Sequence, residues 1–290
     1  MAEKFSGEVV NYDSVQLYRG FDIGSAKLSS EERRGVPHHL LDALDPSEDS
    51  SAGDYARRAR VVLEVLRKRE KTPVLVGGSG FYLRAVLDGL FEGPERDRRL
   101  RERLEAAERR RGSGYLHRVL RRLDPEASQR IHANDVPKVV RALEVRLVGG
   151  ERLVSAFARN TPALEGFQVV RIGLDPERSL LHERINRRAR LMFEGGLLRE
   201  VEALLASGVD RGVWAFGSLG YRQALAVVEG RMGVEAAVEE TALRTRQYAK
   251  RQLTWFRRQE PETNWIHGLG SEERAVAEAL RVVELTRSAG

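Results

Sequence analysis

The sequence predicts a parallel α/β core that carries a helical insertion and continues into a helical C-terminal part. Two short apolar segments, 9–12 and 72–78, each end at a polar or glycine-rich turn, as buried strands do. Between them, residues 52–68 carry apolar side chains at helical spacing. A strand, a crossover helix and a second strand form a parallel βαβ unit, which binds ligands at the carboxyl ends of its strands. Asp13 and Ser79 both follow such an end.

The other segments add one strand and two groups of helices. A third strand is expected at 169–174, and the interval before it lacks a clear strand pattern. Helices are expected at 100–111, 115–123 and 136–148 and, after the third strand, at 179–193, 197–206, 221–228 and 234–258. We therefore expect a core formed by residues 1–95 and 167–290, and an Arg-rich helical insertion at 96–166.

The composition is that of a water-soluble globular protein. Of the 290 residues, 41% are hydrophobic and 32% are charged, and no run approaches the roughly 20 apolar residues that span a bilayer. The first five residues lack the basic and apolar regions of a secretory signal. The chain has no cysteine, which excludes disulfides and thiolate metal sites and fits a cytoplasmic protein.

Positive charge is concentrated in the predicted insertion. The whole chain carries a net charge of +6, and residues 96–130 alone contain twelve arginines against six acidic residues. Arginine binds phosphate through two parallel hydrogen bonds, so this segment is a candidate for binding a polyanion. A solvated helix is the alternative, because Arg101, Glu105 and Arg109 have salt-bridge spacing.

The segment after the first strand concentrates reactive side chains in a few loop residues. It reads Asn11-Tyr-Asp-Ser-Val-Gln-Leu-Tyr-Arg-Gly20. A carboxylate such as Asp13 at a strand end can accept a proton from a nucleophile or hold Mg²⁺ beside phosphate, and the Gln16 amide can read a base edge. Taken alone, Asp13 could equally cap a turn.

Further motifs follow this segment in a specific order. They are Val36-Pro-His-His-Leu-Leu-Asp42, Asp45-Pro46, Pro73-Val-Leu-Val-Gly-Gly-Ser-Gly-Phe-Tyr82, Ile131-His-Ala-Asn-Asp135, Arg141-Ala-Leu-Glu144, Gly220-Tyr-Arg222 and Lys250-Arg-Gln-Leu-Thr-Trp255. In order, spacing and identity the chain resembles the tRNA dimethylallyltransferases over nearly its whole length. The resemblance implies a P-loop-NTPase-like core that joins a dimethylallyl group from its diphosphate to the N6 amine of the adenosine 3′ to the anticodon.

The resemblance also implies roles for individual residues. Asp13 matches the general base, Ser79 the hydroxyl that faces the substrate base, and Arg188 the arginine that binds the diphosphate. Residues implied to contact tRNA are Asp13, Ser14, Val15, Gln16, Ser79, Arg101, Lys138, Arg141, Gly220, Tyr221, Arg222, Lys250 and Arg251. Pro137-Lys138 departs from the family's usual Gln-Arg, and Lys138 lacks the two-pronged guanidinium, so one tRNA contact is expected to be weaker.

The implied partners are tRNA, through its anticodon stem-loop, and dimethylallyl diphosphate, with Mg²⁺ as cofactor. We expect a cytoplasmic monomer that contacts no membrane. His38 and His39 could suggest a protein metal site, but no third ligand stands at a suitable spacing, so none is predicted.

The phosphate-binding loop of such a core has no counterpart in this sequence. No Gly-x-x-x-x-Gly-Lys-[Ser/Thr] occurs, and residues 2–7 resemble the end of the helix that should follow it. We therefore expect a fragment or a misassigned start that lacks the first strand, and a chain that catalyses poorly. An in-frame phosphate-loop segment in the upstream DNA would support this expectation.

Two other function classes stay open at this level. A small-molecule P-loop kinase would transfer phosphate from ATP without RNA, although the Arg-rich insertion counts against it. A non-catalytic tRNA-binding remnant would bind anticodon stem-loops with strong salt dependence and transfer no prenyl group.

Overall fold

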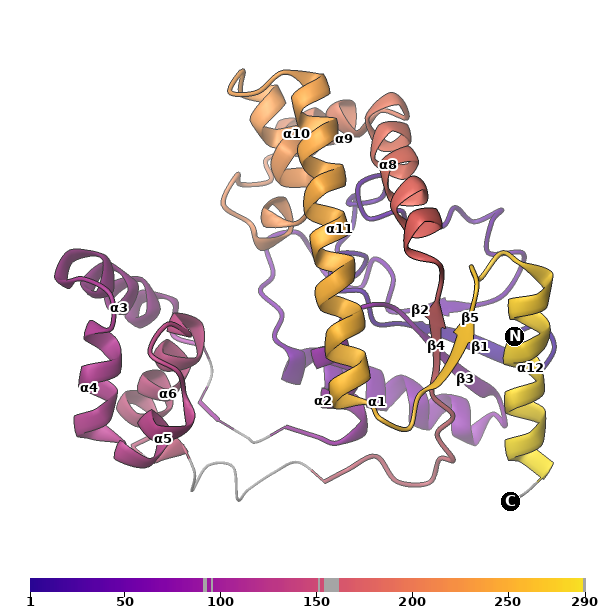
Figure 1. Ribbon diagram of the computed structural model, residues 1–290, viewed down its shortest axis with the longest axis horizontal. Coiled ribbons are helices and arrows are strands. Elements are labelled where there is room, and N and C mark those ends of the chain that lie inside the picture. Colours follow the sequence, from indigo (N-terminus) through magenta and orange to yellow (C-terminus); the bar gives the residue numbers. More distant parts are fainter. Residues whose placement is uncertain (91–92, 95, 151, 154–161, 289–290) are drawn as a thin grey trace. The chain divides into compact units, whose positions relative to one another are not determined.

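The structure, a computed structural model, describes residues 1–90, 93–94, 96–150, 152–153 and 162–288 (Figure 1). The chain divides into two compact units, of which the first joins Met1–Val86 to Glu165–Gly290 and the second is Leu87–Leu164. Residues 151 and 154–161 of the predicted insertion at 96–166 lie outside the described residues.

Parallel strands form the centre of the first unit. β1 (Gly7–Asn11) lies between β2 (His38–His39) and β3 (Thr72–Val76), and both pairings are parallel. β4 (Ile172–Asp175) pairs in parallel with β5 (Asn264–His267) in a separate two-stranded sheet. The predicted parallel α/β core is confirmed, whereas β2 and β5 were not predicted. Both are short, and β2 has only two residues.

Helix α1 (Ala52–Lys68) connects the strands as the sequence predicts. Ser51 accepts a hydrogen bond from Asp54 N, and the Asp54 carboxylate accepts one from Ser51 N, which satisfies amides that a helix start leaves free. Tyr55 and Leu63 lie on its buried face, and the Tyr55 hydroxyl donates to the carbonyl of Asn11 in β1 at 2.9 Å. The crossover helix is thus attached directly to the strand end that precedes Asp13. The short helix α2 (Gly80–Leu87), not predicted, follows β3.

The rest of the first unit is helical. It contains α8 (Arg178–Glu194), α9 (Leu197–Ala206), the 3₁₀ helix η1 (Trp214–Gly217), α10 (Tyr221–Val228), α11 (Val234–Gln259) and α12 (Glu273–Ser288). The four helices predicted after the third strand are confirmed, whereas α12, which packs against β5, was not predicted. α11 packs against α8 and α10, and α10 against α9. No helix in the described part of the chain is both long and apolar enough to cross a membrane.

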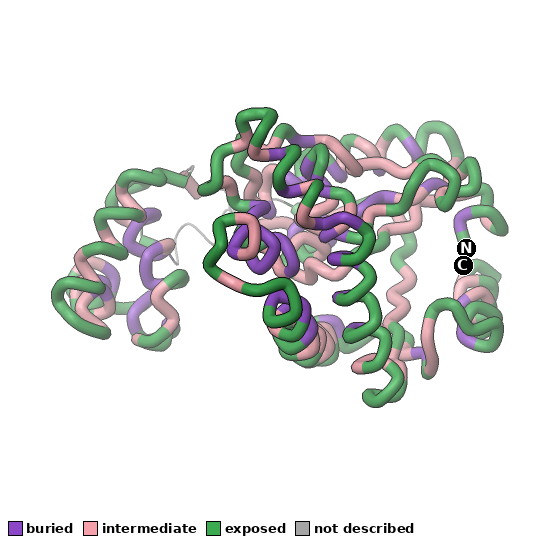
Figure 2. Tube along the Cα trace, turned by 90° about the horizontal axis from the view of Figure 1, so that it is seen from above, coloured by how far each residue is buried: buried purple, intermediate pink, exposed green. Residues whose placement is uncertain are grey.

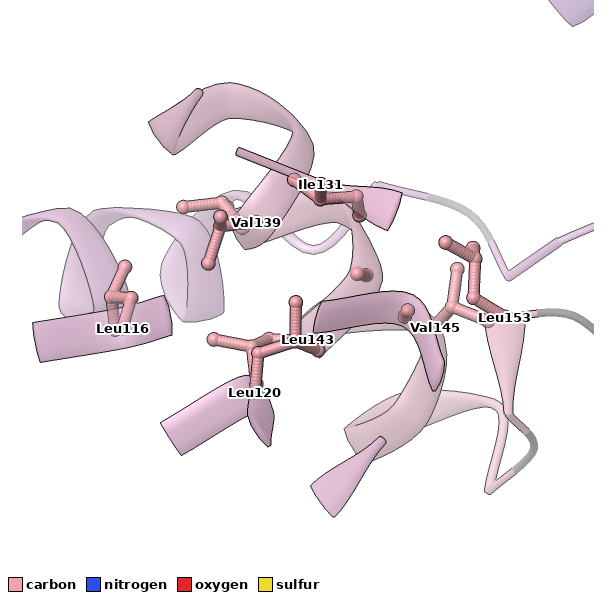
Figure 3. Packing of buried hydrophobic residues seen from close by; sticks show 10 residues of the cluster. Leu116, Leu120, Ile131, Val139, Leu143, Val145 and Leu153 are labelled. Atoms are coloured by element: carbon pink, nitrogen blue, oxygen red, sulfur yellow. The ribbon is translucent and has the colours of Figure 1, made fainter. Parts of the chain in front are cut away.

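The second unit is a small helical domain with its own core. It contains α3 (Arg98–Arg111), α4 (Tyr115–Leu123), α5 (Pro125–Arg130) and α6 (Val136–Val148). Leu116 and Leu120 of α4 pack against Val139 and Leu143 of α6 (Figure 3). α3 has no buried residue along its length (Figure 2). This helix therefore leaves most of its arginines available to solvent or to a ligand, whereas the Arg101 side chain is largely covered.

Candidate active site

The Asp13 side chain occupies the loop at the carboxyl end of β1. Its Oδ1 accepts hydrogen bonds from the backbone amides of Val15 at 2.8 Å and Gln16 at 3.3 Å. Its Oδ2 has no hydrogen bond within the described residues, and the residue is half-buried. The two roles left open by the sequence are therefore compatible, because one oxygen caps a turn while the other is available for a proton or a cation.

Ser79 brings the carboxyl end of β3 against this loop. Its Oγ accepts a hydrogen bond from Ser14 N at 3.2 Å and donates to Ser14 Oγ at 3.3 Å. The approach is close because residue 77 is glycine. A Cβ at Gly77 would lie 2.6 Å from the carbonyl carbon of Tyr12. Adjacent parallel strands therefore place a carboxylate and two hydroxyls together, as the βαβ pattern predicts.

Helix α11 supports the glycine-rich loop from the other side. Gln252 Nε2 donates to the carbonyl of Gly78 at 2.8 Å, and the ring of Trp255 packs so closely on Gly80 that a Cβ there would be 2.3 Å away. Trp255 therefore serves packing. The glycines of this loop permit these close contacts.

Arg188 of α8 provides a positive charge for the same site. Its guanidinium interacts electrostatically with Asp13, although the surrounding protein desolvates it and lowers the pKa of Arg188. The residue as a whole is exposed, so it remains accessible to a ligand. Tyr248 of α11 is a member of the site that sequence reasoning missed. Removal from water, followed by the charge of Asp13, raises the pKa of Tyr248.

A cavity of about 770 Å³ adjoins these groups in the first unit. Arg188, which interacts electrostatically with Asp13, and Gln252, which bonds to the glycine loop, both lie in its wall. Its apolar lining includes Leu174, Leu181, Ile185, Leu191, Met192 and Leu253, and its cations are Arg184, Arg187 and Arg188. Apolar walls with a few charged groups suit a ligand that has a hydrocarbon part and an anionic part.

The predicted RNA contacts of the first unit differ in their exposure. Arg222, Lys250 and Arg251 are exposed and can meet an external ligand. Gly220 and Tyr221 are buried, so a direct contact between Tyr221 and RNA, implied by the resemblance, does not agree with the structure. The ring packs inside the unit because its hydroxyl has internal partners, donating to Glu200 Oε1 at 2.5 Å and accepting from Gly24 N at 3.1 Å.

In the second unit, Arg101 and Arg141 share one buried carboxylate. Arg141 donates to Glu144 Oε2 at 2.5 Å, Arg101 lies 3.8 Å from the same oxygen, and Glu144 Oε1 accepts from Asp97 N at 2.8 Å. Both arginine side chains are about three-quarters buried and thus pre-positioned, whereas the Lys138 side chain is largely exposed and bonded to Asp135. Charge-paired arginines with an exposed edge can still bind phosphate.

His38 and His39 bond to residues that are not part of the candidate site. His39 bonds to the buried Glu8 at 2.6 Å, and Arg69 donates to the same carboxylate at 2.8 Å. The hydrogen bond with His39, followed by the charge of Arg69, keeps the pKa of Glu8 below its usual value even though burial opposes this. His38 bonds to the carbonyl of Val36 at 2.8 Å. In the described part of the chain no three His, Cys, Asp or Glu side chains are grouped to hold a metal.

The fold and the site define a parallel α/β protein whose reactive groups gather at the carboxyl ends of its strands beside a cavity lined by arginine and apolar residues.

Comparison with known proteins specifies the class. The family model described as IPP transferase matches residues 16–259. A tRNA dimethylallyltransferase of Koribacter versatilis is 50% identical over 284 residues, covering 98% of this chain and 92% of its own. One from Solibacter usitatus is 52% identical over 271 residues, covering 93% and 88%.

Solved structures agree with this result. The full-length tRNA isopentenylpyrophosphate transferase of Bacillus halodurans superimposes with a TM-score of 0.67 at 35% identity, covering 99% of this chain and 88% of that chain. A eukaryotic dimethylallyltransferase acting on tRNA gives a TM-score of 0.82 over 99% and 75% of the two chains, and its 24% identity supports the fold alone. The chain belongs to the IPP transferase family.

Proposed function

We propose that this chain transfers a dimethylallyl group from dimethylallyl diphosphate to the N6 amine of the adenosine 3′ to the anticodon of tRNA. The observation that carries the proposal is that Ser79 bonds to the loop of Asp13, while Arg188 interacts with the Asp13 charge and also lines the cavity. Membership of a family whose relatives are named tRNA dimethylallyltransferase supports it.

In the proposed reaction Asp13 acts as general base. Its Oδ1 is held by two backbone amides, so Oδ2 can accept a proton from N6 as the nitrogen attacks C1 of the prenyl group. The bond between C1 and the diphosphate oxygen breaks, and pyrophosphate leaves with the bonding electrons. A guanidinium fixed beside the leaving group stabilises this developing negative charge, which is the role we assign to Arg188.

The cavity provides separate surroundings for the two ends of the prenyl substrate. Leu181, Leu191 and Met192 can cover the hydrocarbon, whose burial is worth about 0.8 kcal/mol for each CH₂-sized group. Arg184 and Arg188 lie in the same wall and can pair with the diphosphate. The arrangement supports a substrate that is apolar at one end and anionic at the other.

We propose Mg²⁺ as the cofactor. It prefers oxygen ligands, and the Ser14 and Ser79 hydroxyls, 3.3 Å apart beside Asp13, are donors of this type. When bound with the diphosphate, Mg²⁺ would neutralise part of its charge. The Ser14 and Ser79 hydroxyls and Asp13 would stay in the positions described above.

For RNA, the proposal assigns exposed and partly exposed residues of both units. They are Ser14, Val15 and Gln16 beside Asp13 and Ser79, together with Arg101, Lys138, Arg141, Arg222, Lys250 and Arg251. Gly220 and Tyr221 are assigned an indirect role because they are buried. We further propose that the chain acts as a cytoplasmic monomer.

The test is a transfer assay with the 290-residue chain, an anticodon stem-loop RNA, dimethylallyl diphosphate and Mg²⁺, followed by mass spectrometry of the nucleosides. We expect N6-(dimethylallyl)adenosine, and a loss of at least about a hundredfold in rate for Asp13→Asn. Asp210→Asn is a matched control, because Asp210 Oδ1 also accepts a backbone amide, from Gly212 at 2.7 Å. RNA binding without any product would instead support the non-catalytic alternative, and normal turnover of Asp13→Asn would refute the general-base assignment.

A further inference from the structure

The amide of Gln16 has a defined orientation in the structure. Its Nε2 lies 3.0 Å from the carbonyl oxygen of Ser25 and 3.4 Å from that of Ala26. Carbonyl oxygens only accept hydrogen bonds, so the nitrogen must face them and Oε1 must face away. Oε1 has no hydrogen bond within the described residues, and Gln16 is half-buried three positions after Asp13. The loop therefore presents an unused acceptor close to the proposed general base.

The turn that holds Gln16 is fixed by two side chains from distant helices. Glu200 of α9 accepts from Ile23 N at 2.8 Å and from Asp22 N at 3.2 Å. Tyr221 of α10 accepts from Gly24 N at 3.1 Å and donates to Glu200 at 2.5 Å. Three consecutive backbone amides of the turn thus donate hydrogen bonds to one pair of side chains, Glu200 and Tyr221. We call this pair the Glu200–Tyr221 clamp.

Packing leaves this turn little freedom to move. A Cβ on Gly24 would lie 2.5 Å from the Tyr221 ring, and Phe21 packs edge-on against Tyr221 with ring centroids 4.8 Å apart. At the end of the turn, the Lys27 ammonium is buried and bonds to the carbonyl of Tyr18 at 3.0 Å, to Asp22 at 2.5 Å and to Asp42 at 2.6 Å. A change in the clamp should therefore be transmitted to the Ser25 and Ala26 carbonyls rather than absorbed locally.

We propose that Glu200 and Tyr221 are positioning residues that orient Gln16 so that its Oε1 selects an amino-bearing base. An acceptor at this place can bind the exocyclic N6–H of adenine and would face, unpaired, the O6 carbonyl of hypoxanthine. The inference rests on the proposed function, because it concerns the base that this site receives. It assigns to the buried Tyr221 a role in base selection without any contact with RNA.

The experiment measures binding of two anticodon stem-loop RNAs by fluorescence anisotropy with the full chain. One RNA carries adenosine at the reacting position and the other carries inosine, which replaces the amine with a carbonyl. We expect the unaltered chain to prefer adenosine by about tenfold, the size of one hydrogen bond and one avoided mismatch. Gln16→Ala and Tyr221→Phe should each reduce this preference to about twofold or less, and the double variant should match the single ones.

Glu200→Gln tests the same clamp without removing a ring contact. Glu229→Gln is the control, because the carboxylate of Glu229, the residue that follows α10, bonds only to the exposed Arg211 and Arg231 among the described residues. Thermal unfolding checks that each variant folds. Equal losses of affinity for both RNAs in Tyr221→Phe, or additive losses in the double variant, would overturn the positioning role. Failure of the unaltered chain to bind either RNA would instead refute the proposed function itself.

Discussion

Asn11 and Asp13 hydrogen-bond to each other twice. Asp13 N donates to Asn11 Oδ1 at 3.0 Å, and Asn11 Nδ2 donates to the carbonyl of Asp13 at 3.2 Å. The same Nδ2 also donates to the carbonyl of Leu40 at 3.1 Å, and Asn11 is buried. The last residue of β1 therefore holds the backbone of the proposed general base and joins it to the loop after β2.

Replacing Asn11 with alanine should destabilise the first unit and misplace Asp13. The variant leaves buried backbone groups without partners, which costs about 1–3 kcal/mol in the free energy of unfolding. Urea denaturation measures this loss. Asn264→Ala is the control, because among the described residues the side chain of this exposed asparagine makes one hydrogen bond, to the carbonyl of Arg171 at 3.0 Å, and its loss should change stability by less than about 0.5 kcal/mol. Equal effects of the two substitutions would contradict the interpretation.

Gly77→Ala should damage the site by forcing β3 and the Asp13 loop apart. The added Cβ would meet backbone atoms of Tyr12 and Asp13 at 2.6 and 2.8 Å, and backbone cannot move aside cheaply. We expect a loss of about 1–3 kcal/mol in stability and a larger relative loss in prenyl transfer. Gly217→Ala tests the specificity of the effect, since nothing lies within 4 Å of its Cβ position. A Gly77→Ala variant with wild-type stability would show that the loops separate easily.

The Glu8 cluster predicts a defined response to acid. Because the folded-state pKa of Glu8 lies below its usual value of 4.5, its ionised form stabilises the fold above that value, and this contribution is lost as pH falls through the lowered pKa. Glu8→Gln should therefore be less stable at neutral pH and lose less additional stability on acidification. Urea midpoints at several pH values below and above 4.5 measure the difference. A steeper acid loss in Glu8→Gln than in the unaltered chain would refute this assignment.

Arg101→Ala should weaken RNA binding more than binding of prenyl diphosphate. Arg101 is held near Glu144, so its exposed edge can meet a phosphate at little cost in side-chain entropy. Losing one phosphate contact should lower the slope of log affinity against log salt by about one. Arg67→Ala removes the same charge from an exposed pair on α1 and serves as the control. An unchanged salt slope in Arg101→Ala would remove Arg101 from the interface.

Periodic and local features were predictable from the sequence. The helix at 52–68 begins and ends where its apolar spacing indicates, and the parallel βαβ unit follows from it. Short elements without a repeat, such as β2 and β5, carry too few residues to show a pattern.

Long-range contacts within the site were harder to predict. Tyr248 lies near Asp13, and Glu200 binds the amides of Asp22 and Ile23, although 177 or more positions separate the partners. A sequence shows the residue types at such contacts but not which of many acidic or aromatic side chains will meet. The burial of Tyr221 was missed for the same reason. Its motif matched a functional pattern, whereas its packing depends on distant residues.

The Glu200–Tyr221 clamp also fixes the order in which the site can form during protein synthesis. The turn at 22–27 leaves the ribosome early, whereas its partners follow about 180 to 200 residues later. At the usual elongation rate of roughly 5–20 residues per second, the turn waits about ten seconds or longer before its amides can bind the clamp. A nascent chain therefore has its proposed general base long before it can hold the neighbouring turn at 22–27 in place, so ordering of this turn must await the C-terminal helices.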